Sequence, residues 1–407
     1  MTRKKPAGGG AVPVSATPKE SLATTTASKG SNSGGGSGSV IVTESDGAPA
    51  SSLSIPHQQR LLNHFAAAFD AVLTAASFPQ LLQEIKQALF RRDFATAFGR
   101  TDYLAAYAAR WSPTRALCYA GIFETYLPPH LTRTPAPSLS PSASSSSSSC
   151  PPGTSHARSP PPPPRRTKMI SVGGCAAEHV AFASFLAQRE SSSRGGGGGG
   201  GGRGELTLLD SAPWDGVAAT VQGTLTAPLP LSKYASAAAK AANVPLLEAT
   251  LGEPPQLHLQ VLQQDALEIT GARWADILGP ADTSSTAVVV TLMFTLNELY
   301  TSGGIAKTTE FLKGLEGALP DGSLLLVVDS PGSYSEAALG KDKKRYPMQW
   351  LLHHTLTDPA SAAQPWTRLE SHDSIWFRLS DQLTYPIQLE NMRYQLHLYR
   401  LEKTPAT

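Results

Sequence analysis

Apolar residues recur with a helical spacing in the first part of the chain and in short continuous runs in the second part. Between residues 57 and 98 they repeat every three to four positions, which is the spacing of one face of a helix. Residues that share such a face are Leu61, Phe65, Phe69, Val72 and Leu73. Because this segment is too small to act alone, we predict that residues 54–130 form a helical cap that packs against the following segment.

From residue 168 onward, short apolar runs alternate with helical segments. The runs predicted to be strands are MISV, ELTLLD, LHLQVLQQDAL, TAVVVTLMFTL and SLLLVVD. The helices predicted between them cover residues 176–188, 230–242 and 304–319. This succession is typical of a parallel sheet covered by helices on both faces. Residues 374–403 are strand-rich, so we predict an α/β fold with a C-terminal antiparallel hairpin at the edge of a mostly parallel sheet.

Three segments have compositions that do not form a packed core. Residues 1–53 are rich in Gly, Ser, Thr and Ala, residues 131–167 in Ser and Pro, and residues 189–204 in Gly. Such segments bury too little apolar surface to offset the entropy of ordering. We therefore predict a disordered tail, a disordered linker and a low-complexity insertion within an α/β domain that covers residues 168–403.

Composition and charge exclude several classes of protein. Lys and Arg number 34 against 32 acidic residues, so the net charge of +2 does not identify a partner. The three cysteines lie far apart and match neither a metal site nor a disulfide framework. The longest apolar run, residues 287–296, is too short to cross a bilayer, and the N-terminus lacks the apolar region of a secretory signal. We expect a soluble intracellular protein without a metal.

Two glycines follow the first predicted strand, where a doubly wound sheet binds its ligands. Gly173 and Gly174 precede Cys175, and Glu178 lies one helical turn further on. Glycines allow a tight turn and a close approach of backbone to ligand, and a helix N-terminus offers free N–H groups. The G-x-G-x-x-G fingerprint of dinucleotide sites is incomplete, which favours a ligand with a carboxylate and no phosphates, such as S-adenosylmethionine. A purely structural turn is the alternative.

Asp210 ends the second predicted strand, 36 positions after Gly174. An acidic residue about 20 positions after such glycines binds ribose hydroxyls in dinucleotide-binding folds. The low-complexity residues 189–204 account for 16 of the 36 positions, and the spacing without them is 20. We therefore interpret the glycine tract as a loop expansion, and Asp210, with Ser211 beside it, as the candidate ribose site.

Polar residues also end the remaining predicted strands. Asp265 and Ala266 follow the third, where they could contact an adenine ring, although Asp265 could instead cap a turn. The fourth ends in Thr295, Leu296, Asn297 and Glu298. Glu298 could face a reacting group, or it could be a solvated acid in the first turn of the next helix. Asp329 ends the fifth strand, before a Pro-Gly turn.

The stretch GKDKKRYPMQWLLHH combines basic and aromatic side chains. Its candidates for contact with RNA are Lys343, Lys344, Arg345, Tyr346 and Trp350. Basic residues can hold phosphates while aromatic rings stack on unpaired bases. A solvated loop that leads into a helix is the alternative. The two adjacent histidines have no Cys or acidic partner at ligand spacing, so we exclude a metal site there.

Five stretches of the chain together resemble one known family. They are RWSPTRALCYAGIF, VGGCAAE, LLDSAPW, TLMFTLNELY and LTYPIQLENMRYQLHLYR. These stretches resemble the fungal large-subunit (25S) ribosomal RNA uridine-N3 methyltransferases, which are S-adenosylmethionine-dependent enzymes with a class I (Rossmann-like) methyltransferase fold. The resemblance covers roughly residues 54–129 and 168–403. It implies a role in ribosome biogenesis, with the rRNA of the pre-ribosomal large subunit as partner.

The resemblance also implies where the cofactor binds. Gly173 and Gly174 would lie beside its methionine moiety and Asp210 on its ribose. The residues at the adenine would be Asp265 and Ala266, and those near the methyl group would be Thr295, Leu296, Asn297 and Glu298. Cys175 departs from the family, which usually has a smaller residue there. The implied location is the nucleus or nucleolus, with the cytoplasm as a further site, and we expect a monomer.

Methylation at uracil N3 requires that the N3 proton be lost to a base. N3 lies on the Watson–Crick edge, so the target must be unpaired or flipped out. Our hypothesis is that Glu298 or Asp329 accepts the proton, while Asn297 binds a uracil carbonyl. Two other classes stay open: an NAD(P)-dependent oxidoreductase, which the missing third glycine disfavours, and a non-catalytic methyltransferase-like scaffold for ribosome assembly.

Overall fold

The computed structural model describes residues 53–131, 166–194, 202–248, 255–279, 286–332, 334–339, 342–357 and 365–403. All of them belong to one compact unit, residues 47–407. Most of the predicted tail and linker lies outside the described residues, as do residues 195–201 of the predicted glycine insertion. The first residues of that insertion are helical, because the helix that starts at Ala176 continues to Arg194.

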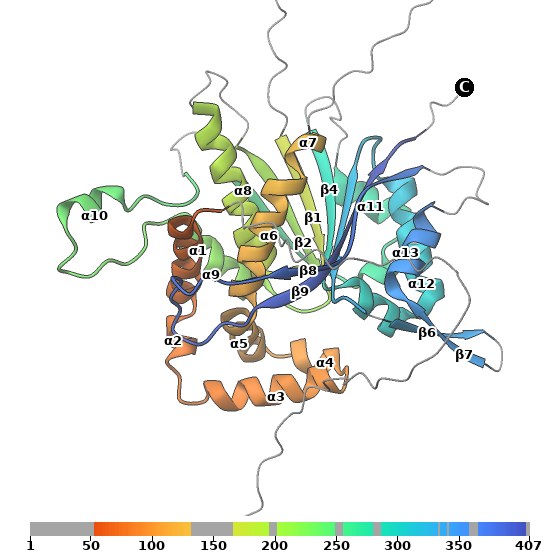
Figure 1. The fold of residues 1–407 in the computed structure, drawn as a ribbon, viewed down its shortest axis with the longest axis horizontal. Coiled ribbons are helices and arrows are strands. Elements are labelled where there is room, and N and C mark those ends of the chain that lie inside the picture. Colours follow the sequence, from red (N-terminus) through yellow and green to blue (C-terminus); the bar gives the residue numbers. More distant parts are fainter. Residues whose placement is uncertain are drawn as a thin grey trace, which may run out of the picture. The chain divides into compact units, whose positions relative to one another are not determined.

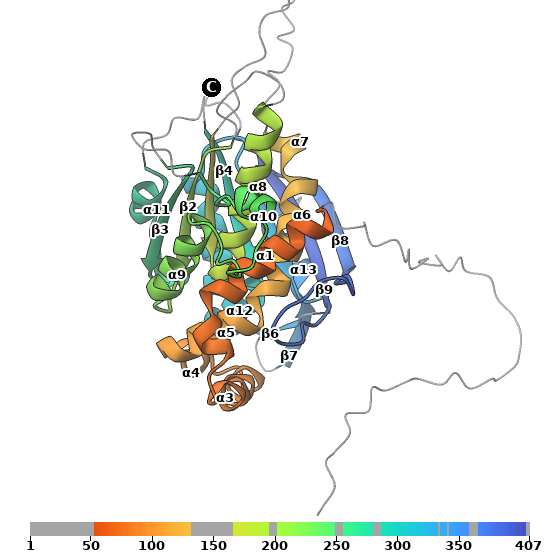
Figure 2. The ribbon, with the colours of Figure 1, turned by 90° about the vertical axis from the view of Figure 1, so that its left-hand side faces the viewer.

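A seven-stranded mixed sheet forms the centre of this unit, with the strand order β3-β2-β1-β4-β5-β9-β8. Its strands are β1 (Arg166–Val172), β2 (Gly204–Asp210), β3 (Leu257–Gln263), β4 (Thr286–Met293), β5 (Leu324–Asp329), β8 (Trp366–Phe377) and β9 (Met392–Leu401). Strands β1 to β5 are parallel, and β9 is antiparallel to both β5 and β8. Figure 2 shows β3 and β8 at opposite edges. The predicted mostly parallel sheet with an antiparallel hairpin at its edge is confirmed.

Helices cover both faces of the sheet. They are α8 (Ala176–Arg194), α9 (Asp215–Leu225), α11 (Gly271–Leu278), α12 (Leu296–Ala318) and α13 (Met348–Thr357), whereas α10 (Ala237–Ala242) buries no side chain. Neighbouring strand residues face different cores: Met169 lies in the core with α8 and α9, and Ile170 in the core with α11, α12 and α13. Figure 1 shows these two groups of helices on opposite sides of the strands. Continuous apolar strands such as β5 result because both faces are buried.

Seven further helices precede the sheet: α1 (Ile55–Ala68), α2 (Asp70–Leu73), α3 (Phe78–Phe90), α4 (Phe94–Phe98), α5 (Thr101–Arg110), α6 (Ser112–Tyr126) and α7 (Pro128–Leu131). Helix α6 packs along α8, and α1 packs against α9. Their buried side chains join the same core as one face of the sheet. The N-terminal helical cap is therefore confirmed as a layer of the same unit. In both views α3, α4 and α5 lie at the end of the strands where a hairpin of β6 (Tyr334–Leu339) and β7 (Asp342–Pro347) projects (Figures 1 and 2).

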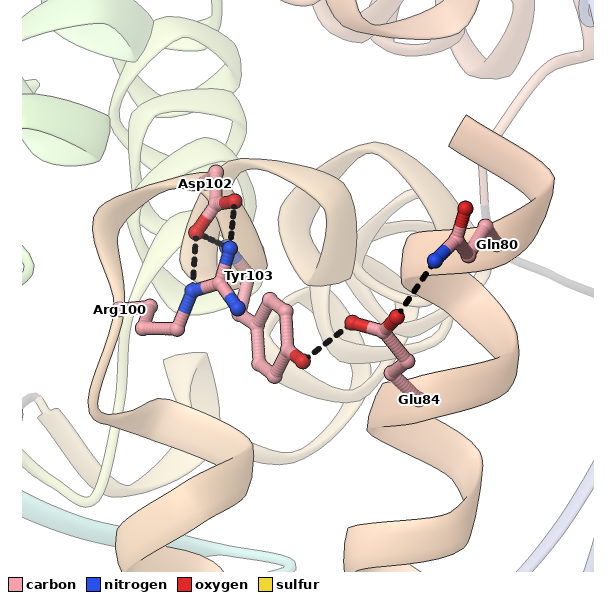
Figure 3. A network of polar contacts seen from close by, with 5 residues as sticks. All are labelled: Gln80, Glu84, Arg100, Asp102 and Tyr103. Atoms are coloured by element: carbon pink, nitrogen blue, oxygen red, sulfur yellow. Dashed lines mark hydrogen bonds and ion pairs between the residues drawn. The ribbon is translucent and has the colours of Figure 1, made fainter. Parts of the chain in front are cut away.

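Polar contacts tie helices α3 and α5 together around the short helix α4. Tyr103 of α5 donates a hydrogen bond of 2.5 Å to Glu84 of α3, which also accepts one from Gln80 (Figure 3). On the other side of the Tyr103 ring, Arg100 forms a 2.5 Å ion pair with Asp102. Each surface contact contributes little by itself. Helix α4 lies between α3 and α5 in the sequence, and its phenylalanines line the cavity described below.

The segment between β8 and β9 reaches back to the cap. Tyr385 donates a hydrogen bond of 2.9 Å to the carbonyl oxygen of Ala109, and Arg110 forms a 2.5 Å ion pair with Glu390. Arg110 belongs to the RWSP stretch and Glu390 to the LENM stretch. Two of the stretches that carry the family resemblance, separated by 280 positions, therefore meet in space.

Three predicted elements differ from the structure. The predicted helix over residues 230–242 is reduced to α10, which buries no side chain, whereas helix α9 was not predicted. The basic stretch forms a two-stranded hairpin of β6 (Tyr334–Leu339) and β7 (Asp342–Pro347). Helix α12 starts at Leu296 and kinks at Gly304, where φ is 68°, so the predicted start at residue 304 marks the kink.

Candidate functional site

A cavity of about 590 Å³ opens at the carboxyl ends of β1, β2 and β4. This is the size range of pockets that bury a cofactor-sized molecule. One wall comes from the loops that follow the strands, and the opposite wall comes from α4, α5 and α6. Its polar or charged lining side chains include Tyr107, Arg115, Cys175, Glu178, Asp210, Ser211, Gln263, Asp265, Thr295 and Glu298.

The loop after β1 needs both of its glycines. Gly173 has a φ of 70°, and a Cβ added there would lie 2.3 Å from the hydroxyl oxygen of Thr295. A Cβ on Gly174 would lie 2.1 Å from the hydroxyl oxygen of Ser171. The Gly173 N–H donates a hydrogen bond of 2.8 Å to the carbonyl oxygen of Leu209. The loop therefore passes closely between its neighbours, with Gly173 in the cavity wall and Gly174 behind it.

Glu178 fixes the start of helix α8. Its Oε2 accepts a hydrogen bond of 2.8 Å from the backbone N–H of Cys175, which is one half of a capping box. Burial raises the pKa of Glu178 to about 7. Burial also raises the pKa of the Cys175 thiol, so this sulfur is not a reactive nucleophile. Both residues line the cavity.

Asp210 and Asp265 each combine a turn with a place in the cavity wall. Asp210 Oδ1 accepts a hydrogen bond of 2.8 Å from the N–H of Ala212, and burial raises its pKa to about 6. Asp265 Oδ1 accepts one of 2.9 Å from the N–H of Leu267 and caps the 3₁₀-helix η1 (Ala266–Glu268). The turn-capping role and the cavity-facing position of Asp265 occur together. Ser211 and Ala266 complete this side of the cavity.

The end of β4 carries backbone strain. Phe294 has a φ of 61°, a conformation that costs energy for a residue with a side chain. Its N–H donates a hydrogen bond of 2.6 Å to the carbonyl oxygen of Val328 on β5. Phe294 and Thr295 line the cavity, whereas Leu296 is fully buried and lies outside the lining. The strained turn thus aims Thr295 at the glycine loop.

The two candidate proton acceptors occupy different positions. Asp329 is 2% exposed and lies outside the cavity lining; its Oδ2 accepts a hydrogen bond of 3.0 Å from the Asn297 N–H, and its Oδ1 accepts one of 2.7 Å from the Ser330 N–H. Glu298 lies in the cavity wall. Burial raises the pKa of Glu298 to about 8 and that of Asp329 to about 6. Asn297 contributes its backbone to this contact and is not among the lining residues.

The cap supplies cavity residues that the sequence analysis did not assign. Arg115 of α6 donates a hydrogen bond of 2.5 Å to the Tyr107 hydroxyl, and its guanidinium lies over the Phe294 ring at 4.8 Å. Phe94 and Phe98 of α4 add apolar surface. Arg115 lies in the RWSPTRALCY stretch that carries part of the resemblance, but no periodicity in the sequence indicates that α6 faces the carboxyl ends of the strands.

The candidate RNA contacts lie outside the cavity lining. Lys343, Lys344 and Arg345 are in β7, and only the backbone of this part of the strand is described. The Tyr346 ring stacks on that of Trp350 with centroids 5.3 Å apart, and Trp350 is 47% exposed. An aromatic pair with one exposed ring thus joins the end of β7 to the start of α13.

The described residues contain neither a metal-ion cluster nor a membrane-spanning helix. Among those residues, no cluster of His, Cys, Asp and Glu side chains could hold a metal ion. No helix in the described parts of the chain is long and apolar enough to cross a membrane.

The sequence was compared with known protein families and curated proteins. A family described as "Putative SAM-dependent methyltransferase" matches residues 65–400, most of the chain. The chain belongs to this family. This methyltransferase is also 27% identical over 332 residues to the 25S rRNA (uridine(2843)-N(3))-methyltransferase of Saccharomyces cerevisiae, an alignment that covers 78% of this chain and 76% of the yeast protein.

Solved structures of methyltransferases were also found to be similar. The N-methyltransferase NodS from Bradyrhizobium japonicum, in complex with S-adenosyl-L-homocysteine, is 12% identical with a TM-score of 0.27, covering 59% of this chain and 80% of NodS. A SAM-dependent methyltransferase from Methanosarcina mazei is 10% identical with a TM-score of 0.29, covering 58% and 92%. Sequence identities and TM-scores this low do not support an inference about this protein. The fold is that of class I methyltransferases on the strength of the strand order and the family.

Family membership establishes S-adenosylmethionine as the cofactor and the protein as a methyltransferase. The residues present fit this molecule. The cavity is large enough, its glycine loop leaves no room for a side chain at Gly173, and a carboxylate, Asp210, ends β2 where hydroxyl groups of a ribose need an acceptor. The NAD(P)-dependent oxidoreductase interpretation has no support from the family.

Proposed function

We propose that this methyltransferase transfers a methyl group from S-adenosylmethionine to N3 of a uridine in large-subunit rRNA. The observation that carries the proposal is the similarity to the yeast 25S rRNA (uridine(2843)-N(3))-methyltransferase, which extends over three quarters of both chains. The cavity supports it, because a carboxyl group suited to accept a proton lies in a wall that also contains the glycine loop.

The proposed cofactor site follows the ends of β1 to β4. Gly173, Gly174, Cys175 and Glu178 form the wall beside the methionine moiety, Asp210 and Ser211 bind the ribose hydroxyls, and Asp265 and Ala266 border the adenine. Thr295 borders the methyl group, and Leu296 anchors this turn in the core. Support comes from the cavity lining, which includes all of these residues except Gly174 and Leu296.

We propose that Glu298, rather than Asp329, accepts the N3 proton. Glu298 lies in the cavity wall, and its pKa of about 8 makes it a stronger base than an ordinary carboxylate. As the N3–H bond breaks, the proton passes to the Glu298 carboxylate. The N3 electron pair forms the bond to the methyl carbon, and the sulfur–carbon bond of the sulfonium breaks with its electrons going to sulfur.

Asp329 takes a positioning role in this proposal. Both of its oxygens accept hydrogen bonds from backbone N–H groups, one of them that of Asn297 at the start of α12. Because Glu298 is the next residue, this contact fixes where the Glu298 side chain enters the cavity. Asn297 thus acts through its backbone, and a contact between its side chain and a uracil carbonyl stays a prediction.

Exposed aromatic and basic side chains beyond the carboxyl end of β5 are suited to binding RNA. The register pairs Asp329 with Gln395 and Trp376 with Arg393, so Trp376 lies beyond the carboxyl end of β5. Trp376 is 43% exposed, and guanidinium groups of Arg378 and Arg393 lie 5.5 and 5.6 Å from its ring centre. Such a group can stack on an unpaired base and pair with phosphates. We propose that it acts together with the β7–α13 segment.

Action on pre-ribosomal RNA would place the protein in the nucleolus, which remains a proposal. The function is tested by incubating the purified protein with S-adenosylmethionine and unmodified large-subunit rRNA, followed by mass spectrometry of the nucleosides. We expect 3-methyluridine, a rate at least 100-fold lower for Glu298→Gln, and product from Asp329→Asn at a reduced rate. Equal rates for wild type and Glu298→Gln would overturn the assignment of the base. Binding of S-adenosyl-L-homocysteine without any rRNA methylation would favour the scaffold alternative.

A further inference from the structure

A cationic side chain from the cap projects into the cavity without a carboxylate partner. Arg115 comes from α6, outside the sheet and its connecting loops. Its guanidinium contacts the Tyr107 hydroxyl and lies over the Tyr107 and Phe294 rings. Among the described residues no carboxylate oxygen lies within the 4.0 Å of an ion pair to it. The guanidinium is therefore held in place but not neutralised.

The nearest acidic groups do not provide the missing charge. Glu178 and Glu298 both face Arg115 at longer range and interact with it electrostatically. Burial raises the pKa of Glu178 to about 7 and that of Glu298 to about 8. Near neutral pH Glu178 is therefore partly protonated and Glu298 is largely protonated. Glu178 is also engaged with the N–H of Cys175. A half-buried cation without an ion-pair partner favours an anionic ligand.

The cofactor carries one such anion. The methionine moiety of S-adenosylmethionine ends in a carboxylate, and the loop at Cys175 that would border this moiety lines the same cavity as Arg115 and Tyr107. Tyr107 lines this cavity together with Gly173, and it is close enough to Cys175 and Arg115 to interact electrostatically with both. A guanidinium can bind a carboxylate through two parallel hydrogen bonds.

We propose that Arg115 binds the carboxylate of the cofactor's methionine moiety, so that the helical cap is part of the cofactor site. The proposal rests on S-adenosylmethionine being the cofactor. The Tyr107 hydroxyl and the Phe294 ring hold the guanidinium in the cavity that the glycine loop also lines. Cofactor binding then links α6 to the loops of the sheet, and the sheet domain without its cap does not bind the cofactor with full affinity.

The test measures binding by calorimetry with two ligands and the full-length protein. S-adenosyl-L-homocysteine has the carboxylate, whereas 5′-methylthioadenosine keeps the adenosine and sulfur but lacks the whole amino acid. We expect Arg115→Met to weaken binding of S-adenosyl-L-homocysteine by about 10- to 100-fold. Binding of 5′-methylthioadenosine should change by less than about threefold, since it has no carboxylate to lose; this ligand also reports that the variant is folded.

Two further variants sharpen the result. Arg115→Lys keeps the charge but not the paired hydrogen bonds, so its loss should lie between those of wild type and Arg115→Met. Arg100→Met removes an exposed arginine of the same cap, whose partner is Asp102, and should bind both ligands as wild type does.

Three outcomes would overturn the proposal, each in a different way. Equal losses for both ligands in Arg115→Met would mean that Arg115 only supports the structure. Unchanged binding of S-adenosyl-L-homocysteine together with lost methyl transfer would mean that Arg115 serves the uridine. Failure of the wild-type protein to bind S-adenosyl-L-homocysteine would refute the cofactor itself, and with it the proposed function.

Discussion

Glu298 should lower the stability of the folded protein while it supports the reaction. Its side chain is partly buried in the cavity wall, and removal from water is the main reason that its pKa is raised; the negative charges of Asp210 and Asp329 raise the pKa further, and the positive charge of Arg115 lowers it. These surroundings raise the pKa from its ordinary value of 4.5 to about 8. The folded state thus holds the Glu298 proton more tightly than the unfolded state does. Below pH 4.5 the group does not oppose folding, and its cost grows as pH rises toward 8.

The size of this cost follows from the shift. Each pH unit between the two pKa values costs about 1.4 kcal/mol. Glu298 therefore lowers the free energy of unfolding by about 1 kcal/mol at pH 5.5, about 3 kcal/mol at pH 7 and about 5 kcal/mol above pH 8. Glu298→Gln removes the charge at every pH, so the variant should be more stable than wild type by these amounts.

Urea unfolding at pH 5.5, 7 and 8.5 tests this prediction. A matched control is Glu310→Gln, which changes an exposed glutamate of the same helix and should leave stability within about 0.5 kcal/mol of wild type at each pH. Methyl transfer by the wild type should rise with pH toward 8, because only the ionised carboxylate accepts a proton, and that of Glu298→Gln should be low throughout. A stability difference that is the same at all three pH values would refute the reasoning.

Three further predictions concern the cofactor site and the RNA surface. Gly173→Ala should destabilise the protein by about 1–3 kcal/mol more than Gly322→Ala, because both glycines have positive φ but only Gly173 would meet Thr295; equal losses in urea unfolding would refute the overlap. Asp210→Asn should weaken binding of S-adenosyl-L-homocysteine about tenfold through the lost charge on the ribose hydroxyls, and unchanged calorimetric affinity would remove Asp210 from the site. Trp376→Ala should weaken binding of an rRNA fragment by about 1–3 kcal/mol in a fluorescence titration without affecting cofactor binding, and unchanged RNA affinity would contradict the proposed surface.

The sequence predicts β2, β4 and β5 well because each is a largely apolar run that is buried on both faces. It also predicts that Gly173, Asp210 and Glu298 follow strand ends, which is enough to bring them to one edge of a parallel sheet. The spacing of 20 positions between Gly174 and Asp210 is obtained only when residues 189–204 are left out of the count.

The helix predictions were wrong in two places, where the helix propensity of the amino acids and the burial of their side chains point in opposite directions. Residues 230–242 are rich in alanine and look helical, but α10 buries no side chain, so little packing stabilises a longer helix there. Helix α9 contains two glycines, which lower its helix propensity, yet Val217, Val221 and Leu225 recur at four-residue spacing and are buried. The four-residue spacing of these apolar side chains could have predicted helix α9.

The position of Arg115 could not be predicted from the sequence. It lies 58 positions before Gly173, with the serine- and proline-rich segment between them. Its place in the cavity depends on how α6 packs along α8, which involves side chains from both helices. The role of Asp329 could not be predicted from the sequence either. Asp329 ends a strand as Asp210 does, but its oxygens accept hydrogen bonds from backbone N–H groups and do not line the cavity.

The most direct test of the central claim is nucleoside mass spectrometry of large-subunit rRNA from cells that lack this protein, compared with cells in which it has been restored. The account predicts that 3-methyluridine is lost from the rRNA without the protein, returns with the wild type, and does not return with Glu298→Gln. Unchanged 3-methyluridine in the cells that lack the protein would contradict it.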